Sequence, residues 1–233
     1  MESLAELMSV RSGPLREPSS TELPRSSSAS ARRVSPMRDR IGLGGILAEK
    51  TFDTFDPERQ PATDRPRILA ALEAARSFVE RPRTLVFSGP NGIGKTHLAA
   101  AIGNALVEKH GLTSVPVCFV SFQDALRKVR MTYQEGWQGM GEEWWLERWR
   151  AVPVLILDEV GQAGLEKEPS EFTRKIGYEI VDGRYRAGHR PMIVTTNKSP
   201  GALGDWITES AVSRLGEMGE FVLMTGQDMR LKR

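Results

Sequence analysis

Residues 89–96 read Gly-Pro-Asn-Gly-Ile-Gly-Lys-Thr, and the fold of the chain can be worked out from them. They match G-x-x-x-x-G-K-S/T, the pattern of a phosphate-binding loop between a strand and a helix. The apolar residues 84–87 ahead of the loop favour a strand, and residues 97–102 after it favour a helix. This context predicts a nucleotide phosphate site, in preference to a glycine-rich turn that binds nothing.

The chemistry of this loop depends on its backbone as much as on its side chains. Its glycines let N–H groups turn toward phosphate oxygens, and the N-terminus of the next helix adds a favourable dipole. Lys95 can reach the β- and γ-phosphates, and Thr96 can offer its hydroxyl to Mg²⁺. The predicted nucleotide-binding residues are Gly89, Pro90, Asn91, Gly92, Ile93, Gly94, Lys95, Thr96 and His97.

Strand-forming and helix-forming segments alternate along the rest of the chain. An amphipathic helix is expected over residues 68–79, and further strands are expected at 115–122, 152–160, 190–196 and 220–225. The run 152–160 is apolar on both faces, as in a covered parallel sheet. We therefore expect an α/β fold, a three-layer sandwich around a mostly parallel five-stranded sheet.

Polar residues follow two of these strands where phosphoryl transfer would need them. Asp158 and Glu159 end the strand 152–160, at the edge where parallel sheets hold their ligands. We expect Asp158 to bind Mg²⁺, and Glu159 to orient or deprotonate the attacking water. Asn197 follows the strand 190–196 and can hold that water. The alternative for Asn197 is a turn residue that caps the next helix.

Composition excludes several protein classes. The chain has 233 residues and one cysteine, Cys118, which excludes a disulfide framework and a zinc module. No apolar run approaches the roughly 20 residues that cross a bilayer, and residues 1–10 lack the pattern of a signal peptide. A cytoplasmic protein without membrane contact is expected. The net charge of +2 is too small to predict nucleic-acid binding without local patches.

Three regions are expected along the chain. Residues 1–40 are rich in Ser, Pro and Arg and predict a disordered tail. Within it, residues 2–9 have the spacing of a short partner-docking helix, although a frayed terminus is the favoured interpretation. Residues 41–66 are expected to form a linker. Residues 67–233 are expected to form the nucleotide-binding domain.

Two surface features have competing interpretations. The helix expected at residues 123–134 turns Arg127, Lys128 and Arg130 outward, either as a solvated face or as contacts to nucleic-acid phosphates. The segment 142–150 carries Trp144, Trp145 and Trp149, with the last two on one helical face. Burial against the sheet is the favoured interpretation, and a partner-docking surface is the alternative.

The loop, residues 155–159 and residues 195–197 together resemble the AAA+ ATPases of the initiator and helicase-loader branch. More narrowly, they are similar to the DnaC/IstB family of ATP-binding proteins. Residues 94–99 and 51–57 are typical of that family. The resemblance covers about residues 50–233. It implies an AAA+ ATPase domain that binds ATP and Mg²⁺ and hydrolyses ATP to ADP and phosphate as a switch.

The resemblance also implies roles for individual residues. Lys95 and Thr96 would form Walker A, with Asp158 and Glu159 as Walker B and Asn197 as sensor 1. Two arginines lie further along the chain. Arg214 resembles an arginine finger that reaches a neighbouring subunit, which implies homo-oligomers with shared ATP sites. Arg230 resembles a phosphate sensor, although Met229 stands where the family has Tyr. Seven residues after Gly226 imply a reduced or absent helical lid.

Two partners are compatible with this core. A helicase loader would assemble on single-stranded DNA and deliver a DnaB-type replicative helicase. An IstB-like transposition helper would assemble on duplex DNA and recruit a transposase. Residues 1–40 suit a linear docking segment, which favours the loader. Asn197 and Arg214 argue against a small-molecule P-loop kinase, and Glu159 argues against a module that binds ATP without hydrolysing it.

Overall fold

Five parallel strands form one sheet in the computed structural model, which describes residues 36–111, 114, 116–162 and 168–230. The strand order is β2-β3-β4-β1-β5. Every neighbouring pair is parallel. This confirms the predicted α/β architecture. The strands are β1 (Thr84–Ser88), β2 (Val117–Ser121), β3 (Val154–Val160), β4 (Met192–Thr196) and β5 (Gly219–Leu223). The docking helix predicted at residues 2–9 lies outside the described ranges.

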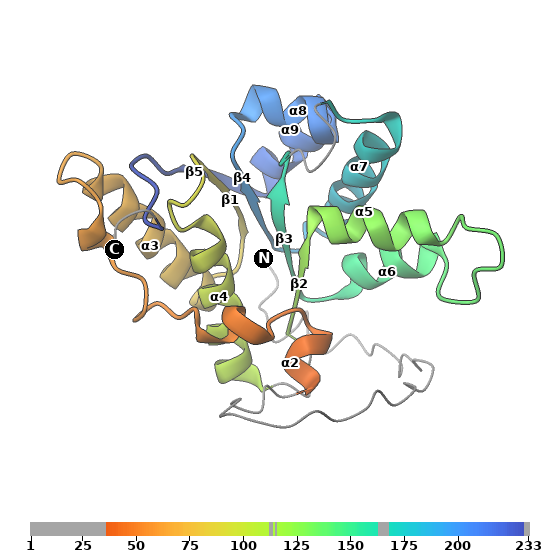
Figure 1. The fold of residues 1–233 in the computed structure, drawn as a ribbon, viewed down its shortest axis with the longest axis horizontal. Coiled ribbons are helices and arrows are strands. Elements are labelled where there is room, and N and C mark those ends of the chain that lie inside the picture. Colours follow the sequence, from red (N-terminus) through yellow and green to blue (C-terminus); the bar gives the residue numbers. More distant parts are fainter. Residues whose placement is uncertain (1–35, 112–113, 115, 163–167, 231–233) are drawn as a thin grey trace.

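Helices cover both faces of the sheet and make three layers (Figure 1). Side chains alternate along each strand, so β3 sends Ile156 into the first core and Leu155 and Leu157 into the second. The first face packs against α3 (Arg65–Glu80) and α4 (Lys95–His110). The second face packs against α5 (Phe122–Met131), α6 (Glu142–Ala151), α7 (Glu171–Arg186), α8 (Pro200–Ile207) and α9 (Glu209–Met218).

The helix boundaries follow local sequence signals. Helix α4 begins after Gly94, which has a φ of 101°, and it is followed by Gly111, which has a φ of 78°. Helices α8 and α9 are separated at Thr208. Thr208 has a φ of 79°, and its hydroxyl accepts a hydrogen bond from the N–H of Ala211. None of the helices in the described ranges is long and apolar enough to cross a bilayer.

The segment before α3, which we expected to be a linker, packs on the domain. It contains α2 (Pro36–Arg40), η1 (Gly45–Glu49) and η2 (Pro57–Arg59). Ile41 and Leu43 are fully buried in the first core. Asn104 of α4 donates hydrogen bonds from its side chain to the carbonyls of Leu47 and Lys50, at 2.8 and 2.7 Å. The packed unit therefore starts at least as early as residue 36, ahead of the predicted boundary at residue 67.

The segment after β5 folds back over the phosphate-binding loop. Within the described residues 224–230 there is no helix, in line with the reduced lid expected from the sequence. The N–H of Met229 donates to the carbonyl of Gly92 at 3.0 Å. The buried side chain of Gln60 exchanges two hydrogen bonds with the backbone of Gln227, at 2.8 and 2.9 Å. The segment before α3 and the segment after β5 thus meet beside the loop.

A buried arginine links α6, β3 and β4 at the amino ends of the strands, opposite the end of the sheet that carries the loop. Arg184 of α7 is fully buried, and its hydrogen-bond acceptors in the described structure are all backbone carbonyls. They include Trp149 at 2.6 Å, Val152 at 3.0 Å and Pro153 at 3.0 Å. Burial lowers the pKa of Arg184 to about 9, which leaves it protonated at neutral pH. Arg184 therefore satisfies carbonyls that α6 and the strand starts would leave without donors.

We expect Arg184→Met to lower the free energy of unfolding by ~3–5 kcal/mol, because it leaves several buried carbonyls without a donor. Urea unfolding followed by circular dichroism measures this. The matched control is Arg186→Met on the same helix, since the Arg186 side chain is 71% exposed. We expect that control to change stability by about 0.5 kcal/mol or less. Equal losses in the two variants would contradict the role given to Arg184.

Candidate nucleotide-binding site

A cleft of about 510 Å³ opens at the carboxyl ends of the central strands. Strand β4 lies between β1 and β3, so the segments that follow these three strands meet at one place. Nine of the residues predicted from the sequence line this cleft: Asn91, Gly92, Gly94, Lys95, Thr96, His97, Glu159, Asn197 and Arg230. Gly89, Pro90, Ile93 and Asp158 lie next to it, and Arg214 lies elsewhere.

The phosphate-binding loop is held by its glycines and by one core residue. A Cβ on Gly94 would come within 2.6 Å of the Phe55 ring and 2.9 Å of the Met229 side chain. Ile93 is fully buried, so its side chain anchors the loop to the core. The Lys95 ammonium donates to the carbonyls of Gly89 at 2.8 Å and Pro90 at 2.7 Å. Burial lowers the pKa of Lys95.

Asp158 links three elements behind the cleft. Its carboxylate accepts hydrogen bonds from Thr96 at 3.0 and 3.1 Å and from Thr195 at 2.6 Å. The side chain is only 5% exposed, and burial raises the pKa of Asp158 to about 6 although both hydroxyls favour its charged form. The two residues predicted to share Mg²⁺, Thr96 and Asp158, are therefore in direct contact.

A bulge in β3 turns Glu159 toward the cleft. The register passes from Leu157 opposite Val194 to Val160 opposite Thr196, so two residues of β3 face one residue of β4. Glu159 has a φ of 60°, a conformation that costs a non-glycine residue about 1 kcal/mol or more. Its N–H donates to the Thr195 hydroxyl at 2.8 Å. Asp158 is buried while its neighbour Glu159 is exposed. The strained backbone thus gives two adjacent carboxylates different environments.

The residues present suit a magnesium ion bound together with phosphates. Thr96 and Asp158 offer hard oxygen donors, and Asn197 has a buried side-chain oxygen without a hydrogen-bond partner in the described structure. The described residues contain no cluster of three or more His, Cys, Asp or Glu that could hold a metal alone. Mg²⁺ needs no such cluster, because it is commonly held by one or two carboxylates, water and substrate phosphates.

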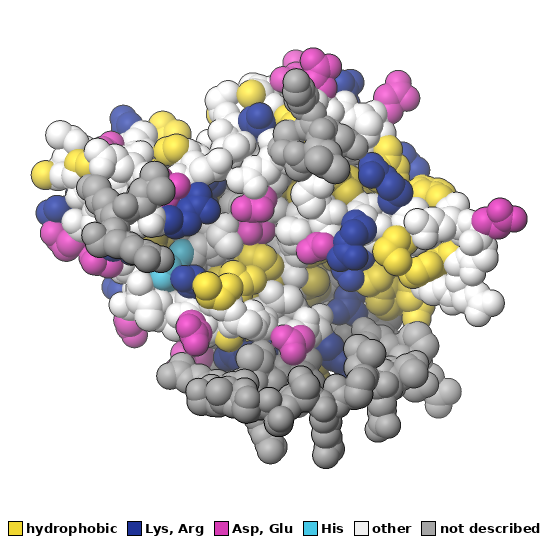
Figure 2. Space-filling view, in the orientation of Figure 1, with side chains coloured by type: hydrophobic (Ala, Val, Ile, Leu, Met, Phe, Trp, Pro, Cys, Tyr) yellow, Lys and Arg dark blue, Asp and Glu magenta, His cyan; other side chains and the backbone are white. Residues whose placement is uncertain are grey.

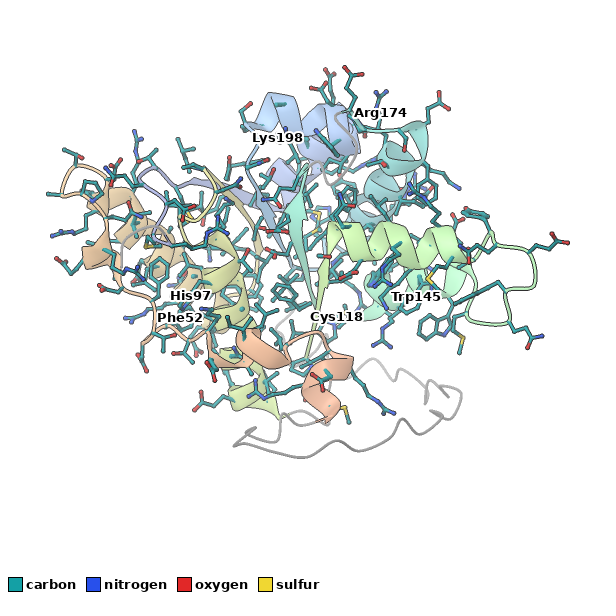
Figure 3. The ribbon with its side chains drawn as sticks, viewed as in Figure 1. Phe52, His97, Cys118, Trp145, Arg174 and Lys198 are labelled. Atoms are coloured by element: carbon teal, nitrogen blue, oxygen red, sulfur yellow. The ribbon has the colours of Figure 1, made fainter. Side chains whose placement is uncertain are left out.

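The opposite wall of the cleft comes from the segment before α3. The His97 Nε2 lies 2.9 Å from the Thr51 carbonyl, and the His97 ring packs edge-on against Phe55 with centroids 5.3 Å apart. Figure 3 shows His97 and Phe52 together on this side. Thr54, Phe55 and Arg59 line the cleft, although no site role was predicted for them. The motif at residues 51–57 was the signal that could have found this wall.

The two predicted arginines occupy different places. Arg230 lines the cleft, where its guanidinium pairs with Asp228 at 3.1 Å. Arg214 lies on α9, away from the residues that line the cleft, and forms an ion pair with Asp182 of α7 at 3.1 Å. Arg214 also stacks over the ring of Tyr178, 5.1 Å from its centre. One subunit therefore does not bring Arg214 to its own nucleotide cleft.

The chain is similar to known ATP-binding proteins. The sequence profile of IstB-like ATP-binding proteins matches residues 26–233. The chain is 34% identical over 182 residues to the ATP-binding protein of insertion sequence IS5376 from Geobacillus stearothermophilus, covering 78% of this chain and 66% of that relative. It is 29% identical over 154 residues to the replicative helicase loader DnaC of Buchnera aphidicola (strain Bp), covering 66% of this chain and 58% of that relative.

A solved structure supports the same grouping. The crystal structure of the DnaC helicase loader matches with a TM-score of 0.61 at 27% identity, covering 76% of this chain and 98% of that one. Lengths differ among the relatives. The chain spans 60% to 66% of the length of three insertion-sequence relatives, less than two thirds of each.

We expect Asp158→Asn to stabilise the nucleotide-free protein at about pH 7.5 by ~1–2 kcal/mol, because it removes a buried charge. The pKa of Asp158 rises from an ordinary 3.8 to about 6 on folding. Ionisation of this carboxyl therefore lowers the free energy of unfolding as the pH rises from 3.8 to about 6. Below about pH 3.8 the carboxyl is neutral in both states, and the advantage of Asn should vanish. Thermal unfolding across this pH range measures it, with exposed Asp205→Asn as the control. A gain in stability that is the same at every pH would contradict the raised pKa of Asp158.

Proposed function

This chain belongs to the family of IstB-like ATP-binding proteins, and we propose that it is an ATPase that uses hydrolysis of ATP to ADP and phosphate as a switch on DNA. The observation that carries this proposal is the cleft. It combines a phosphate-binding lysine, a Thr96–Asp158 pair, an exposed Glu159 and an unpartnered Asn197 oxygen. Binding alone does not require Glu159, whereas hydrolysis requires a group that can take a proton from water.

In this proposal each residue performs one step of phosphoryl transfer. Lys95 leaves its loop carbonyls and pairs with the β- and γ-phosphates. Thr96 and Asp158 would hold Mg²⁺, which neutralises phosphate charge when bound. Glu159 accepts a proton as the water oxygen bonds to the γ-phosphorus and the bond to ADP breaks. Asn197 holds the water in line, and Arg230 contacts phosphate once it leaves Asp228.

We further propose that Arg214 completes the site of a neighbouring subunit. Its pairing with Asp182 holds the guanidinium on α9, outside its own cleft. A second copy that docked against α9 would receive this arginine at its γ-phosphate, where a positive charge stabilises the transition state. The active form is then a homo-oligomer with ATP sites between subunits.

Mixing two inactive variants tests hydrolysis and the shared site together. We expect Glu159→Gln and Arg214→Ala each to bind ATP and to lose at least about 100-fold in turnover. A mixture should regain activity, because some interfaces then combine an intact Glu159 with an intact Arg214. Lys95→Ala mixed with Glu159→Gln is the control for added protein, measured by phosphate release. If the first mixture stays as inactive as its parts, Arg214 acts within one subunit or not at all.

A basic and aromatic face over α5 and α6 supports DNA as the surface on which this switch works (Figure 2). Trp149 is buried as predicted, while Trp144 and Trp145 remain half-buried. Cations lie over aromatic rings on this face, at 4.4, 5.1 and 5.4 Å from the ring centres: Lys128 over Trp145, Arg130 over Phe172 and Arg148 over Trp144. Alternating cations and rings suit phosphates and stacked bases, so we propose this face as the DNA contact.

For the partner, we propose a transposase. Two insertion-sequence relatives are 34% and 30% identical over 78% and 71% of this chain, and the DnaC relative is 29% identical over 66% of it. The sequence alone favoured the helicase loader, and the fold similarity to DnaC keeps a DnaB-type helicase as the second candidate. We propose that residues 1–40 carry the docking segment for either partner. The nucleotide-binding domain is proposed to extend to residue 233.

Co-purification discriminates the two partners. We expect the ATP-bound Glu159→Gln protein to retain the transposase of its own element on duplex DNA and not to retain the host's replicative helicase. Both should be tested with the full chain and with a chain lacking residues 1–35. Retention of the helicase alone would reverse the choice of partner. Loss of retention in the shortened chain would support the docking role of the tail.

A further inference from the structure

Gln60 is a buried polar residue that the proposed function does not use. It follows η2, and it is only 2% exposed. Its amide nitrogen donates to the Gln227 carbonyl at 2.8 Å, and its amide oxygen accepts from the Gln227 N–H at 2.9 Å. Each end of the amide meets the complementary backbone group, which fixes the orientation of the amide. Gln60 therefore fastens the segment after β5 to the segment before α3 (Figure 1).

Residues 225–230, which we call the strap, follow a path that depends on this contact. Gly226 has a φ of 140°, and a Cβ on it would collide with the Gln60 amide oxygen. The Thr225 hydroxyl donates to the Asp64 carboxylate at 2.8 Å, just ahead of α3. The start of the strap is thus held by two residues of one neighbouring segment, and glycine is needed where the strap passes Gln60.

The other end of the strap lies on the phosphate-binding loop. The Met229 N–H donates to the Gly92 carbonyl at 3.0 Å. A Cβ on Gly92 would collide with the Asp228 carboxylate, so the absence of a side chain in the loop makes room for the strap. Arg59, on the wall of the cleft, donates to the Met229 carbonyl. The strap therefore bridges the loop and the opposite wall.

The strap ends by presenting Arg230 to the cleft. The Arg230 N–H donates to the Asp228 carboxylate at 2.8 Å, and its guanidinium donates to the same group at 3.2 and 3.1 Å. Arg230 lines the cleft together with Lys95 and Glu159. Asp228 raises the pKa of Arg230 and Glu159 adds to the rise, as expected for a cation within electrostatic reach of both carboxylates. A fixed cation thus faces the region where Lys95 would hold phosphates.

We propose that Gln60 is a positioning residue that sets Arg230 at the γ-phosphate, and that it thereby lets the site distinguish ATP from ADP. Gln60 is not among the residues that line the cleft, so it acts through the backbone of Gln227. An arginine held in place loses less conformational freedom on binding phosphate than one on a loose segment. This inference rests on the proposed function, which uses Arg230 as a phosphate contact, and it adds the residue that gives this contact its place.

Nucleotide binding by the full chain tests the proposal without hydrolysis. Calorimetric titration compares a non-hydrolysable ATP analogue with ADP, both with Mg²⁺. We expect Gln60→Met, which keeps the volume and removes both hydrogen bonds, to weaken binding of the analogue about tenfold and of ADP about twofold or less. Arg230→Ala should show the same selective loss, and adding Gln60→Met to it should cost nothing further. The matched control is Gln227→Ala, which removes an exposed side chain and keeps the backbone groups that Gln60 contacts.

A second variant reaches the same contact from the strap. Gly226→Ala introduces the Cβ that would collide with Gln60, and we expect the same selective loss of the analogue. Equal losses for the analogue and ADP in both variants would show that Gln60 only maintains the wall, and they overturn the inference. Additive losses for Gln60→Met and Arg230→Ala overturn it too.

Phosphate release, measured separately, distinguishes failure of the proposed function from failure of this inference. An unaltered protein that binds the analogue and releases no phosphate overturns the proposed ATPase function, while a selective loss in Gln60→Met still supports the positioning role. An unaltered protein that hydrolyses ATP, beside a Gln60→Met protein with unchanged affinities, overturns the positioning role alone.

Discussion

The buried carboxylate of Asp158 constrains the functional end of this molecule. A charged group at 5% exposure is stable only if hydrogen bonds replace its water. Thr96 and Thr195 supply them, and in doing so they fix the start of α4 and the end of β4 relative to β3. Burial still raises the pKa of Asp158 to about 6, so these hydrogen bonds offset only part of the cost of burying the charge. The need of this buried charge for hydrogen bonds thus holds β3, β4 and the start of α4 together, although they are far apart in sequence.

The two ends of strands β3 and β4 are stabilised by buried side chains of opposite charge. At the amino ends of β3 and β4, the Arg184 guanidinium is surrounded by carbonyl oxygens. At their carboxyl ends, Asp158 is surrounded by hydroxyl donors. The first arrangement is closed to ligands, while the second opens on a cleft and carries the strained backbone of Glu159. Such strained backbone persists only where the surrounding structure holds it in place.

Charged groups near the cleft already have partners within the chain. Near the cleft, Lys95 contacts its loop carbonyls and Arg230 pairs with Asp228, while Arg214 on α9 pairs with Asp182. A ligand can shift such an arrangement only by binding the rearranged state more tightly. In the proposed function, nucleotide would replace the contacts of Lys95 and Arg230, and a second subunit would replace that of Arg214. That division suits a protein whose output is a change of state more than a rapid reaction.

The sequence by itself determined the α/β class, the phosphate-binding loop and the identity of Asp158, Glu159 and Asn197, because these follow from short-range patterns and strand periodicity. Only the tertiary structure decided that residues 41–60 pack as a wall of the domain, since single apolar residues such as Ile41 have no periodicity to reveal their burial. The bulge at Glu159 depends on strand register, which no local pattern records. Arg214 shows the same limit, because its distance from its own cleft is a property of how α7 and α9 pack.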